Sequence, residues 1–366
     1  MRPDYLDIVL EVVFPYDVVL EIAIEVALDI ALEDVVLDVP LEAICRSKMC
    51  VKTCFFAVAT FLVGMLFLVS VRLSLEEQHV TVDYDLPPFL DGWKVQLHCR
   101  SPLEVLFFVH TASEHAAHRQ FLRDTLGHSS ISEQLKSALI FFVGQSKNLT
   151  TRAAVHAEAK ASGDMVVFPF LDTYRNLTYK FVYGLKWVTD NCRDSVRFVV
   201  KIDDDALVNV FLLADYLRNI TDTEAESSIH CLAWRRTVAV RNRKSKWYVT
   251  RQEYPSRMYP TYCGGLGFIL HSKLLPLLFN ASRQAPFLWV DDVYSTGILA
   301  KAAHVGHIQI RRYYELYPNE TAANVRPDAM FTHLGVPGLV EQRYRMWDNI
   351  LQMNNASVSR TEASGG

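Results

Sequence analysis

The sequence predicts an α/β fold, with one main domain built on a mainly parallel sheet. Short apolar runs rich in β-branched residues alternate with stretches whose apolar residues recur at helical spacing. The links between these runs are short, so consecutive strands are expected to lie side by side through right-handed crossovers. In addition, three acids, Asp203 to Asp205, directly follow one apolar run, at the strand end where open α/β sheets place their ligands.

Residues 1–44 carry eleven acids against one base, Arg2. From Asp17 onward an acid returns at nearly every fourth position, which would draw an acidic stripe along a helix and is too charged for a membrane span. We expect residues 1–53 to form a cytosolic tail. Alternatively, residues 1–48 are not native, because Met49 can serve as initiator. The rest of the chain is only mildly basic, so we expect no nucleic-acid partner.

Residues 54–71 form an uncharged apolar run at the lower range for a transmembrane helix. Basic residues precede it, so the positive-inside rule puts the amino end in the cytosol and the body in a lumen or outside the cell. A cleaved signal peptide is the alternative, but no clear Ala-x-Ala site follows, which favours an uncleaved signal-anchor. We expect a stem over 72–100, a globular domain over 101–355 and a flexible tail over 356–366.

The globular domain alternates strands and helices along the chain. We expect strands at 103–110, 138–144, 164–169 and 198–202, and helices at 119–126, 151–161 and 179–189. A further helical pattern begins after the three acids, with Leu207, Phe211 and Leu217 on one side. No Gly-x-Gly-x-x-Gly follows the first strand, which argues against a dinucleotide site.

Asp203, Asp204 and Asp205 repel one another unless they share a cation, and hard oxygen ligands suit Mg²⁺ or Mn²⁺. The alternative is that one aspartate caps the following helix while the others are solvated.

Three downstream stretches carry further candidate chemistry. Lys246-Trp247-Tyr248 and the run from Tyr259 to Gly267 combine aromatics, which stack on sugars, with the pair Gly264-Gly265, which lets backbone approach a ligand; an aromatic core turn is the alternative. Trp289-Val-Asp-Asp-Val-Tyr294 offers a carboxylate as general base, or a helix cap. His333 offers a metal ligand, although a lone histidine is more often a core or surface residue.

Cysteines and glycosylation signals agree with a lumenal domain. Cys99, Cys192, Cys231 and Cys263 allow up to two disulfides in three pairings, and no Cys-x-x-Cys spacing indicates zinc. Asn-x-Ser/Thr acceptors all lie beyond the apolar run, at Asn148, Asn176, Asn219, Asn280, Asn319 and Asn355.

Taken in order, these motifs resemble the Golgi β-1,3-galactosyltransferase and β-1,3-N-acetylglucosaminyltransferase family, to which the fringe enzymes are more distantly related. The resemblance covers about residues 103–350. The matching segments are Arg123-Asp-Thr-Leu-Gly127, Phe170-Leu-Asp-Thr-Tyr-Arg-Asn-Leu-Thr178, Lys201-Ile-Asp-Asp-Asp205, Lys246-Trp-Tyr248, residues 259–267 and Asp291-Asp-Val293. Each match alone is weak, but their order and spacing together are specific.

The resemblance implies a GT-A fold and inverting transfer from a UDP-sugar with Mn²⁺ or Mg²⁺. Asp205 would bind the metal with help from Asp203 and His333. Asp203 and Asp204 would hold nucleotide and metal, with Lys201 and Arg123 on the cofactor side. Asp292 would be the general base. Substrate contacts are expected from Trp247, Tyr259, Gly264, Gly265 and Asp291.

Two residues depart from the family pattern. Leu126 replaces the usual Trp, and Asp291 replaces Glu, which keeps the charge but shortens the side chain by one methylene. Neither change removes the expected base or metal acids.

We therefore expect a single-pass type II Golgi membrane enzyme that moves galactose from UDP-galactose in β-1,3 linkage onto a glycan of a glycoprotein or glycolipid. The alternatives are UDP-N-acetylglucosamine or UDP-N-acetylgalactosamine as donor, and a non-catalytic glycan-binding relative. An acid-cluster phosphatase or nuclease is disfavoured, because the chain lacks the Asp-x-Asp-Gly-Thr surroundings and a basic stripe.

Overall fold

The computed structural model describes residue 64, residues 95 and 99, and residues 101–335 and 339–363. The chain divides into two units, Met1–Gln78 and His79–Gly366, and the elements below belong to the second. The predicted tail, membrane span and stem lie outside the described residues, apart from the three single positions. Over the described ranges, no helix is both long and apolar enough to cross a membrane.

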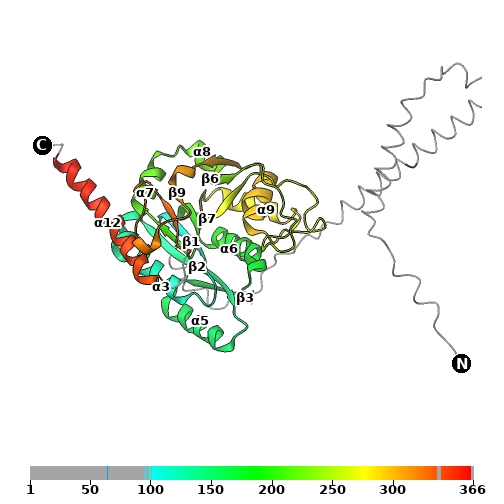
Figure 1. The fold of residues 1–366 in the computed structure, drawn as a ribbon, viewed down its shortest axis with the longest axis horizontal. Helices are drawn as coiled ribbons and strands as arrows, with labels where there is room; N and C mark the ends of the chain where they lie inside the picture. Colours follow the sequence, from blue (N-terminus) through cyan, green and yellow to red (C-terminus); the bar gives the residue numbers. More distant parts are fainter. Residues whose placement is uncertain (1–63, 65–94, 96–98, 100, 336–338, 364–366) are drawn as a thin grey trace, which may run out of the picture. The chain divides into compact units, whose positions relative to one another are not determined.

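A seven-stranded sheet forms the centre of the second unit, in the order β3-β2-β1-β4-β7-β6-β8 (Figure 1). The strands are β1 Leu103–His110, β2 Ser137–Gln145, β3 Met165–Leu171, β4 Val196–Asp203, β6 Ser228–Trp234, β7 Tyr262–His271 and β8 Gly306–Gln309. Strand β7 runs antiparallel to β4 and β6, whereas the other pairs are parallel. The predicted α/β class with a mainly parallel sheet is confirmed.

Apolar side chains cover both faces of this sheet. In β1, Leu106 and Phe108 belong to one buried cluster, while Val105, Phe107 and Val109 belong to the other. Successive side chains of a strand point to opposite faces, so a strand covered on both sides is apolar at every position. This is why the strands were recognisable in the sequence as continuous hydrophobic runs.

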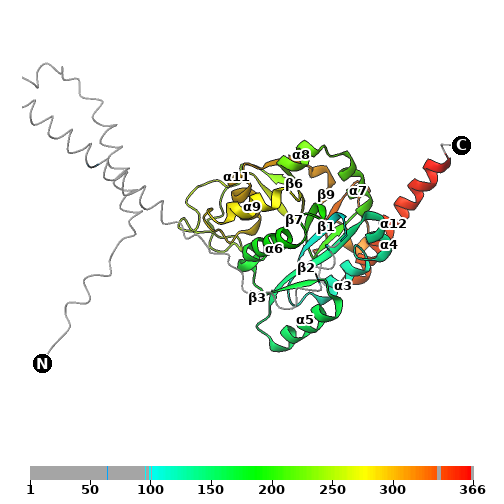
Figure 2. The same cartoon turned by 180° about the vertical axis from the view of Figure 1, so that it is seen from behind.

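Helices supply the two covering layers. The longer ones are α3 Ala116–Asp124, α4 Ser129–Leu135, α5 Leu149–Ser162, α6 Leu177–Asn191, α7 Val210–Asn219, α8 Asp222–Ser227, α9 Leu274–Ser282 and α12 Val340–Ala363. Short turns are η4 Tyr174–Asn176, α10 Asp291–Val293, η5 Tyr294–Ile298, α11 Leu299–Ala302, η6 Arg311–Tyr313 and η7 Glu320–Ala322. Helices α6 and α9 contribute to the first cluster, and α3, α5, α7 and α12 to the second. Figures 1 and 2 show where these helices lie around the sheet.

One expectation about the segment after the three acids was wrong. Leu207 does not begin a helix; it lies in a short strand, β5 Ala206–Val208, which pairs with β10 Phe331–His333. Strand β10 also pairs with β9 Tyr314–Glu315, which completes a second, three-stranded sheet. Helix α7 starts three residues later, where Asn209 accepts hydrogen bonds from two backbone N–H groups. No aspartate of the triplet is therefore needed as its cap.

Two disulfides settle the pairing that the sequence left open. Cys99 bonds to Cys192 at the end of α6, and Cys231 bonds to Cys263 across β6 and β7. The second disulfide directly precedes Gly264, so it fixes the strand that carries the glycine pair.

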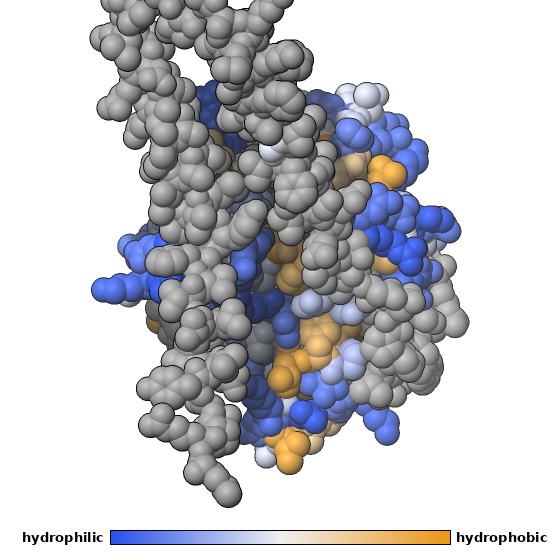
Figure 3. All heavy atoms as spheres, turned by 90° about the vertical axis from the view of Figure 1, so that its right-hand side faces the viewer, coloured by the Kyte–Doolittle hydropathy of each residue, from blue (hydrophilic) through white to orange (hydrophobic). Residues whose placement is uncertain are grey.

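Exposed apolar side chains are few compared with the buried ones. On the face drawn in Figure 3, hydrophobic residues occupy small areas between hydrophilic ones. Two of the exposed aromatics, Tyr174 at 49% and Trp247 at 48%, lie in the candidate site described next.

Candidate active site

A cleft of about 480 Å³ opens beside the carboxyl end of β4 and the amino half of β7. It brings together most of the residues predicted for the site, although they come from five separate segments. The predicted residues that line it are Asp203, Asp205, Trp247, Gly264, Gly265, Asp291, Asp292 and His333.

The carboxylate of Asp203 accepts a hydrogen bond from a buried lysine. Lys201 Nζ donates to Asp203 Oδ1 at 2.6 Å and to the Gly265 carbonyl at 2.8 Å. Burial favours the neutral acid and, with the charge of Asp205, outweighs Lys201, so the pKa of Asp203 is raised to about 6. The predicted site residue Lys201 thus lies under the cleft, where it ties β4 to the glycine pair.

Asp205 lies next to His333, as expected for a shared cation site. His333 Nε2 is 3.4 Å from Asp205 Oδ2, and the hydrogen bond to Asp205 raises the pKa of His333. The contact follows from the second sheet, in which His333 pairs with Ala206, and the Leu334 N–H donates to the Asp205 carbonyl. Residues 128 positions apart in the chain are brought together in this way.

Asp292 is held by the glycine pair. The Gly265 N–H donates to Asp292 Oδ2 at 3.1 Å, and a Cβ at position 265 would overlap the Asp292 carboxylate. Burial raises the pKa of Asp292, while the Lys201 charge and the Gly265 N–H work in the opposite direction. Only glycine allows this close approach, which explains the Gly-Gly signal in the sequence.

Asp291 is more deeply buried than its neighbour. Burial raises its pKa to about 7, since the repulsion from Asp292 adds to the desolvation and Lys201 only partly compensates. His110 Nδ1 lies 3.7 Å from Asp291 Oδ2, but burial holds the pKa of His110 well below its ordinary value, so this neighbour is uncharged. Within the described part of the chain, neither His110 ring nitrogen has a hydrogen-bond partner.

An aromatic wall, defined as Tyr174, Trp247 and Trp289, forms another side of the cleft. Trp247 Nε1 donates to the Tyr174 hydroxyl at 2.9 Å, and the Tyr174 and Trp289 rings lie 6.2 Å apart. Lys246 Nζ stands 4.6 Å from the centre of the Trp247 ring. Of these three residues, only Trp247 was predicted for the site. Tyr174 and Trp289 lie in the same sequence motifs as other predicted residues, but nothing in their spacing shows that they face one cleft.

Arg123 and Tyr259 lie elsewhere in the domain. Arg123 donates to Asp164 at 2.7 and 2.9 Å and to Glu158 at 2.8 Å, so its guanidinium joins α3 to α5 and the start of β3. Tyr259 is buried and packs against the Tyr254 ring at 5.0 Å. The expected nucleotide contact of Arg123 and substrate contact of Tyr259 do not follow from these positions.

Asp204 also points away from the cleft residues. Its carboxylate accepts a hydrogen bond from the Thr111 hydroxyl at 2.7 Å and lies within hydrogen-bond distance of His115 and His118. Burial works to raise its pKa, but these bonds outweigh it and hold the pKa well below the ordinary value. The three adjacent acids therefore have two different surroundings. Asp203 ends β4, whereas Asp204 and Asp205 form the turn between β4 and β5.

Four of the predicted glycosylation acceptors, Asn148, Asn219, Asn280 and Asn319, are exposed, and Asn176 is half-buried. Asn355 lies within α12, which continues to Ala363 and so runs through most of the segment predicted as a flexible tail.

The fold and the cleft together define an α/β protein whose acids lie beside the ends of its central strands, facing an aromatic wall. A family model described as Galactosyltransferase matches residues 117–311, more than half of the chain. The chain belongs to the galactosyltransferase family.

Named relatives agree with this assignment. β-1,3-Galactosyltransferase 5 of Homo sapiens is 28% identical over 199 residues, which covers 54% of this chain and 63% of that protein. β-1,3-Galactosyltransferase 1 of Mus musculus is 30% identical over 194 residues, covering 53% of this chain and 58% of that protein. The chain therefore spans less than two thirds of the length of these relatives. A solved structure of the galactosyltransferase LgtC overlays with a TM-score of 0.34 at 11% identity, covering 67% of this chain and 95% of that chain.

Proposed function

We propose that this protein is an inverting, metal-dependent glycosyltransferase of GT-A type. It would move galactose from UDP-galactose in β-1,3 linkage onto a glycan acceptor of a glycoprotein or glycolipid. The proposal rests on the residues that share one cleft. In it the Asp292 carboxylate accepts a hydrogen bond from the Gly265 N–H, and Asp203, Asp205 and His333 lie together at the end of β4.

The residues at the end of β4 suit a divalent cation. Asp203 and Asp205 offer carboxylate oxygens, and His333 offers an imidazole nitrogen within 3.4 Å of Asp205. Two carboxylates with an added nitrogen donor fit Mn²⁺ better than Mg²⁺, which prefers oxygen alone. When bound, the cation would neutralise charge on the UDP diphosphate leaving group. Burial, together with the charge of Asp205, raises the pKa of Asp203, and a shared cation would favour its ionised form.

Asp292 is the proposed general base. Its carboxylate would accept the proton of the acceptor hydroxyl as that oxygen forms a bond to the anomeric carbon and the bond to UDP breaks. One base and one in-line attack invert the anomeric centre without a covalent intermediate. Lys201 and the Gly265 N–H both favour the ionised carboxylate that this step requires.

The aromatic wall is the proposed sugar-binding surface. Exposed faces of Tyr174 and Trp247 can stack on pyranose rings, and their mutual hydrogen bond fixes both rings beforehand. In this proposal Asp204 and Arg123 act indirectly, through packing around the ends of β4 and α3, since both are already engaged by protein groups.

The wider organisation is proposed on the same basis. Residues 54–71 would anchor the protein in the Golgi membrane as a single-pass type II signal-anchor. Residues 72–100 would form the stem, and the domain from residue 101 would lie in the lumen. The two disulfides support an oxidising compartment for that domain.

The test is a donor screen with the purified full-length chain in detergent and Mn²⁺. UDP-galactose, UDP-N-acetylglucosamine and UDP-N-acetylgalactosamine are each incubated with a panel of glycan acceptors, and the linkage of any product is determined. A β-1,3-galactosylated product is the expected outcome. Transfer of another sugar corrects the donor, and no turnover of any donor by a folded chain favours a glycan-binding protein instead.

A further inference from the structure

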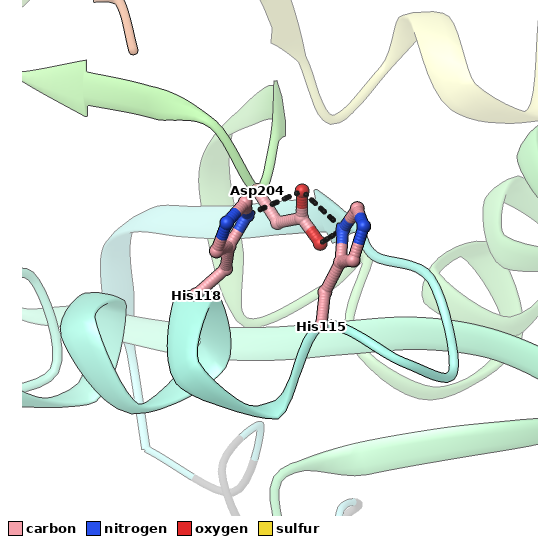
Figure 4. A group of neighbouring side chains, drawn as sticks. All are labelled: His115, His118 and Asp204. Atoms are coloured by element: carbon pink, nitrogen blue, oxygen red, sulfur yellow. Dashed lines mark hydrogen bonds and ion pairs between the residues drawn. The ribbon is translucent and has the colours of Figure 1, made fainter. Parts of the chain in front are cut away.

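A second group of polar side chains lies next to the cleft but outside the proposed chemistry. His115, His118 and Asp204 place two imidazoles on one buried carboxylate (Figure 4). His115 Nδ1 is 2.9 Å from Asp204 Oδ2, and His118 Nδ1 is 3.3 Å from Asp204 Oδ1. The donor atoms of all three residues lie within 4.8 Å of one another.

The arrangement follows from local structure. His115 immediately precedes α3 and His118 lies three residues further on, so both side chains fall on the same side of the helix. Their rings stand 4.6 Å apart, centre to centre. Asp204 directly follows β4, whose neighbour β1 leads into the loop before α3. The group is not recognisable in the sequence, because His118 and Asp204 are 86 positions apart.

The carboxylate is fixed by a further layer of protein groups. The Thr111 hydroxyl donates to Asp204 Oδ2 at 2.7 Å, and Arg119 donates to that hydroxyl at 3.2 Å. Arg119 is in turn held by Glu158. Such supporting bonds are typical around metal-binding carboxylates, because they orient the ligand before the ion arrives.

We propose that His115, His118 and Asp204 bind a divalent transition-metal ion, with zinc the best match. In a tetrahedral site with bonds of about 2.0–2.1 Å, ligand atoms lie about 3.3–3.4 Å apart, close to the separations of Asp204 from the two rings. Two imidazoles and one carboxylate suit zinc rather than manganese, and water would complete the tetrahedron. His115 is 44% exposed at its side chain, which gives the ion access from solvent.

This site is separate from the proposed manganese site. Asp203 and Asp205 line the cleft, whereas Asp204, between them in sequence, faces α3. The inference does not depend on the proposed transferase activity, since it rests on ligand chemistry alone. Its competitor is a purely structural arrangement, in which both imidazoles donate Nδ1–H to Asp204 and no ion is bound.

Zinc binding to the metal-stripped, full-length chain separates the two cases. Calorimetric titration with ZnCl₂ is run with saturating Mn²⁺ present. Because zinc binds such ligands more tightly than Mn²⁺, zinc that binds equally to a variant without the two histidines is assigned to the cleft acids. The variants are the double substitution His115→Ala/His118→Ala and, as a matched control, His156→Ala on α5, outside the group. We expect one zinc per chain for the wild type and for H156A, and at least tenfold weaker binding for the double variant.

A second measurement on the wild-type chain is needed in case the double variant does not fold. Co²⁺ added to the wild-type chain should give the intense visible absorption of a tetrahedral nitrogen- and oxygen-ligated ion, and zinc should abolish it. Absence of zinc binding by the wild type, or equal binding by the wild type and a folded double variant, overturns the proposal. An octahedral Co²⁺ spectrum overturns it as well.

Discussion

Replacing Asp292 by Asn tests the proposed base with the least disturbance to the cleft. The amide has nearly the shape of the carboxylate, and its oxygen can still accept the Gly265 N–H that Asp292 accepts at 3.1 Å. The substitution removes only the negative charge and the ability to take up a proton. Because the residues proposed for the cation, Asp203, Asp205 and His333, are unchanged, nucleotide binding should survive.

The size of the effect follows from what a general base contributes. Loss of a positioned base costs about 10²–10⁴-fold in rate. At about 1.4 kcal/mol per factor of ten, this corresponds to roughly 3–5 kcal/mol of lost transition-state stabilisation. Removing the charge also relieves repulsion on Asp291, whose pKa is raised to about 7. The free energy of unfolding of the variant should therefore be no lower than that of the wild type.

The assay measures transfer rate and UDP–Mn²⁺ affinity for Asp292→Asn and for a companion variant, Asp205→Ala. We expect Asp292→Asn to lose transfer and to keep its affinity for UDP–Mn²⁺ within about threefold, whereas Asp205→Ala loses both. Equal loss of nucleotide binding in the two variants, or an active Asp292→Asn enzyme, would refute the division of roles between the two acids.

Three further outcomes are expected. Gly265→Ala should lower the transfer rate by about 10–100-fold in a folded protein, because the new methyl group displaces the Asp292 carboxylate; wild-type rates would contradict this. The acid limb of the pH profile of kcat/KM should lie above the ordinary aspartate pKa of 3.8, since burial raises the pKa of Asp292 and the base works only when ionised; activity that persists down to pH ~4 would contradict it. Cys192→Ser should lower the free energy of unfolding by up to about 4–5 kcal/mol, because its disulfide to Cys99 closes a separation of 93 residues; in denaturant unfolding, the double Cys→Ser variant should lose no more than either single one.

Much of the fold was predictable from the sequence because the central strands are buried on both faces. Strand β1 was predicted at its observed bounds, and β2 and β4 to within a few residues. The short strand β5 was missed. Three residues are too few to show a hydrophobic period, and β5 forms because β10, more than a hundred residues later, pairs with it.

The residues of the candidate site were likewise predictable only in part. Acids and glycines could be chosen from the sequence, because Asp292 and Gly265 sit in short motifs with a clear chemical reading. The assignment of Arg123 to the nucleotide was unsupported by its placement, because its ion pairs with Glu158 and Asp164 depend on how α5 packs beside α3.

The α/β class, the acid triplet at a strand end and the family resemblance all follow from the sequence, since local hydrophobic period and residue order express them. Which of the three acids face the cleft depends on the tertiary structure. Asp203 at the end of β4 and Asp205 beside the β5–β10 pairing line the cleft, where His333 lies 3.4 Å from Asp205. Asp204, in the same turn as Asp205, instead contacts His115 and His118. Side-chain direction and long-range pairing cannot be derived from local sequence, and here they place one run of three aspartates in two different surroundings.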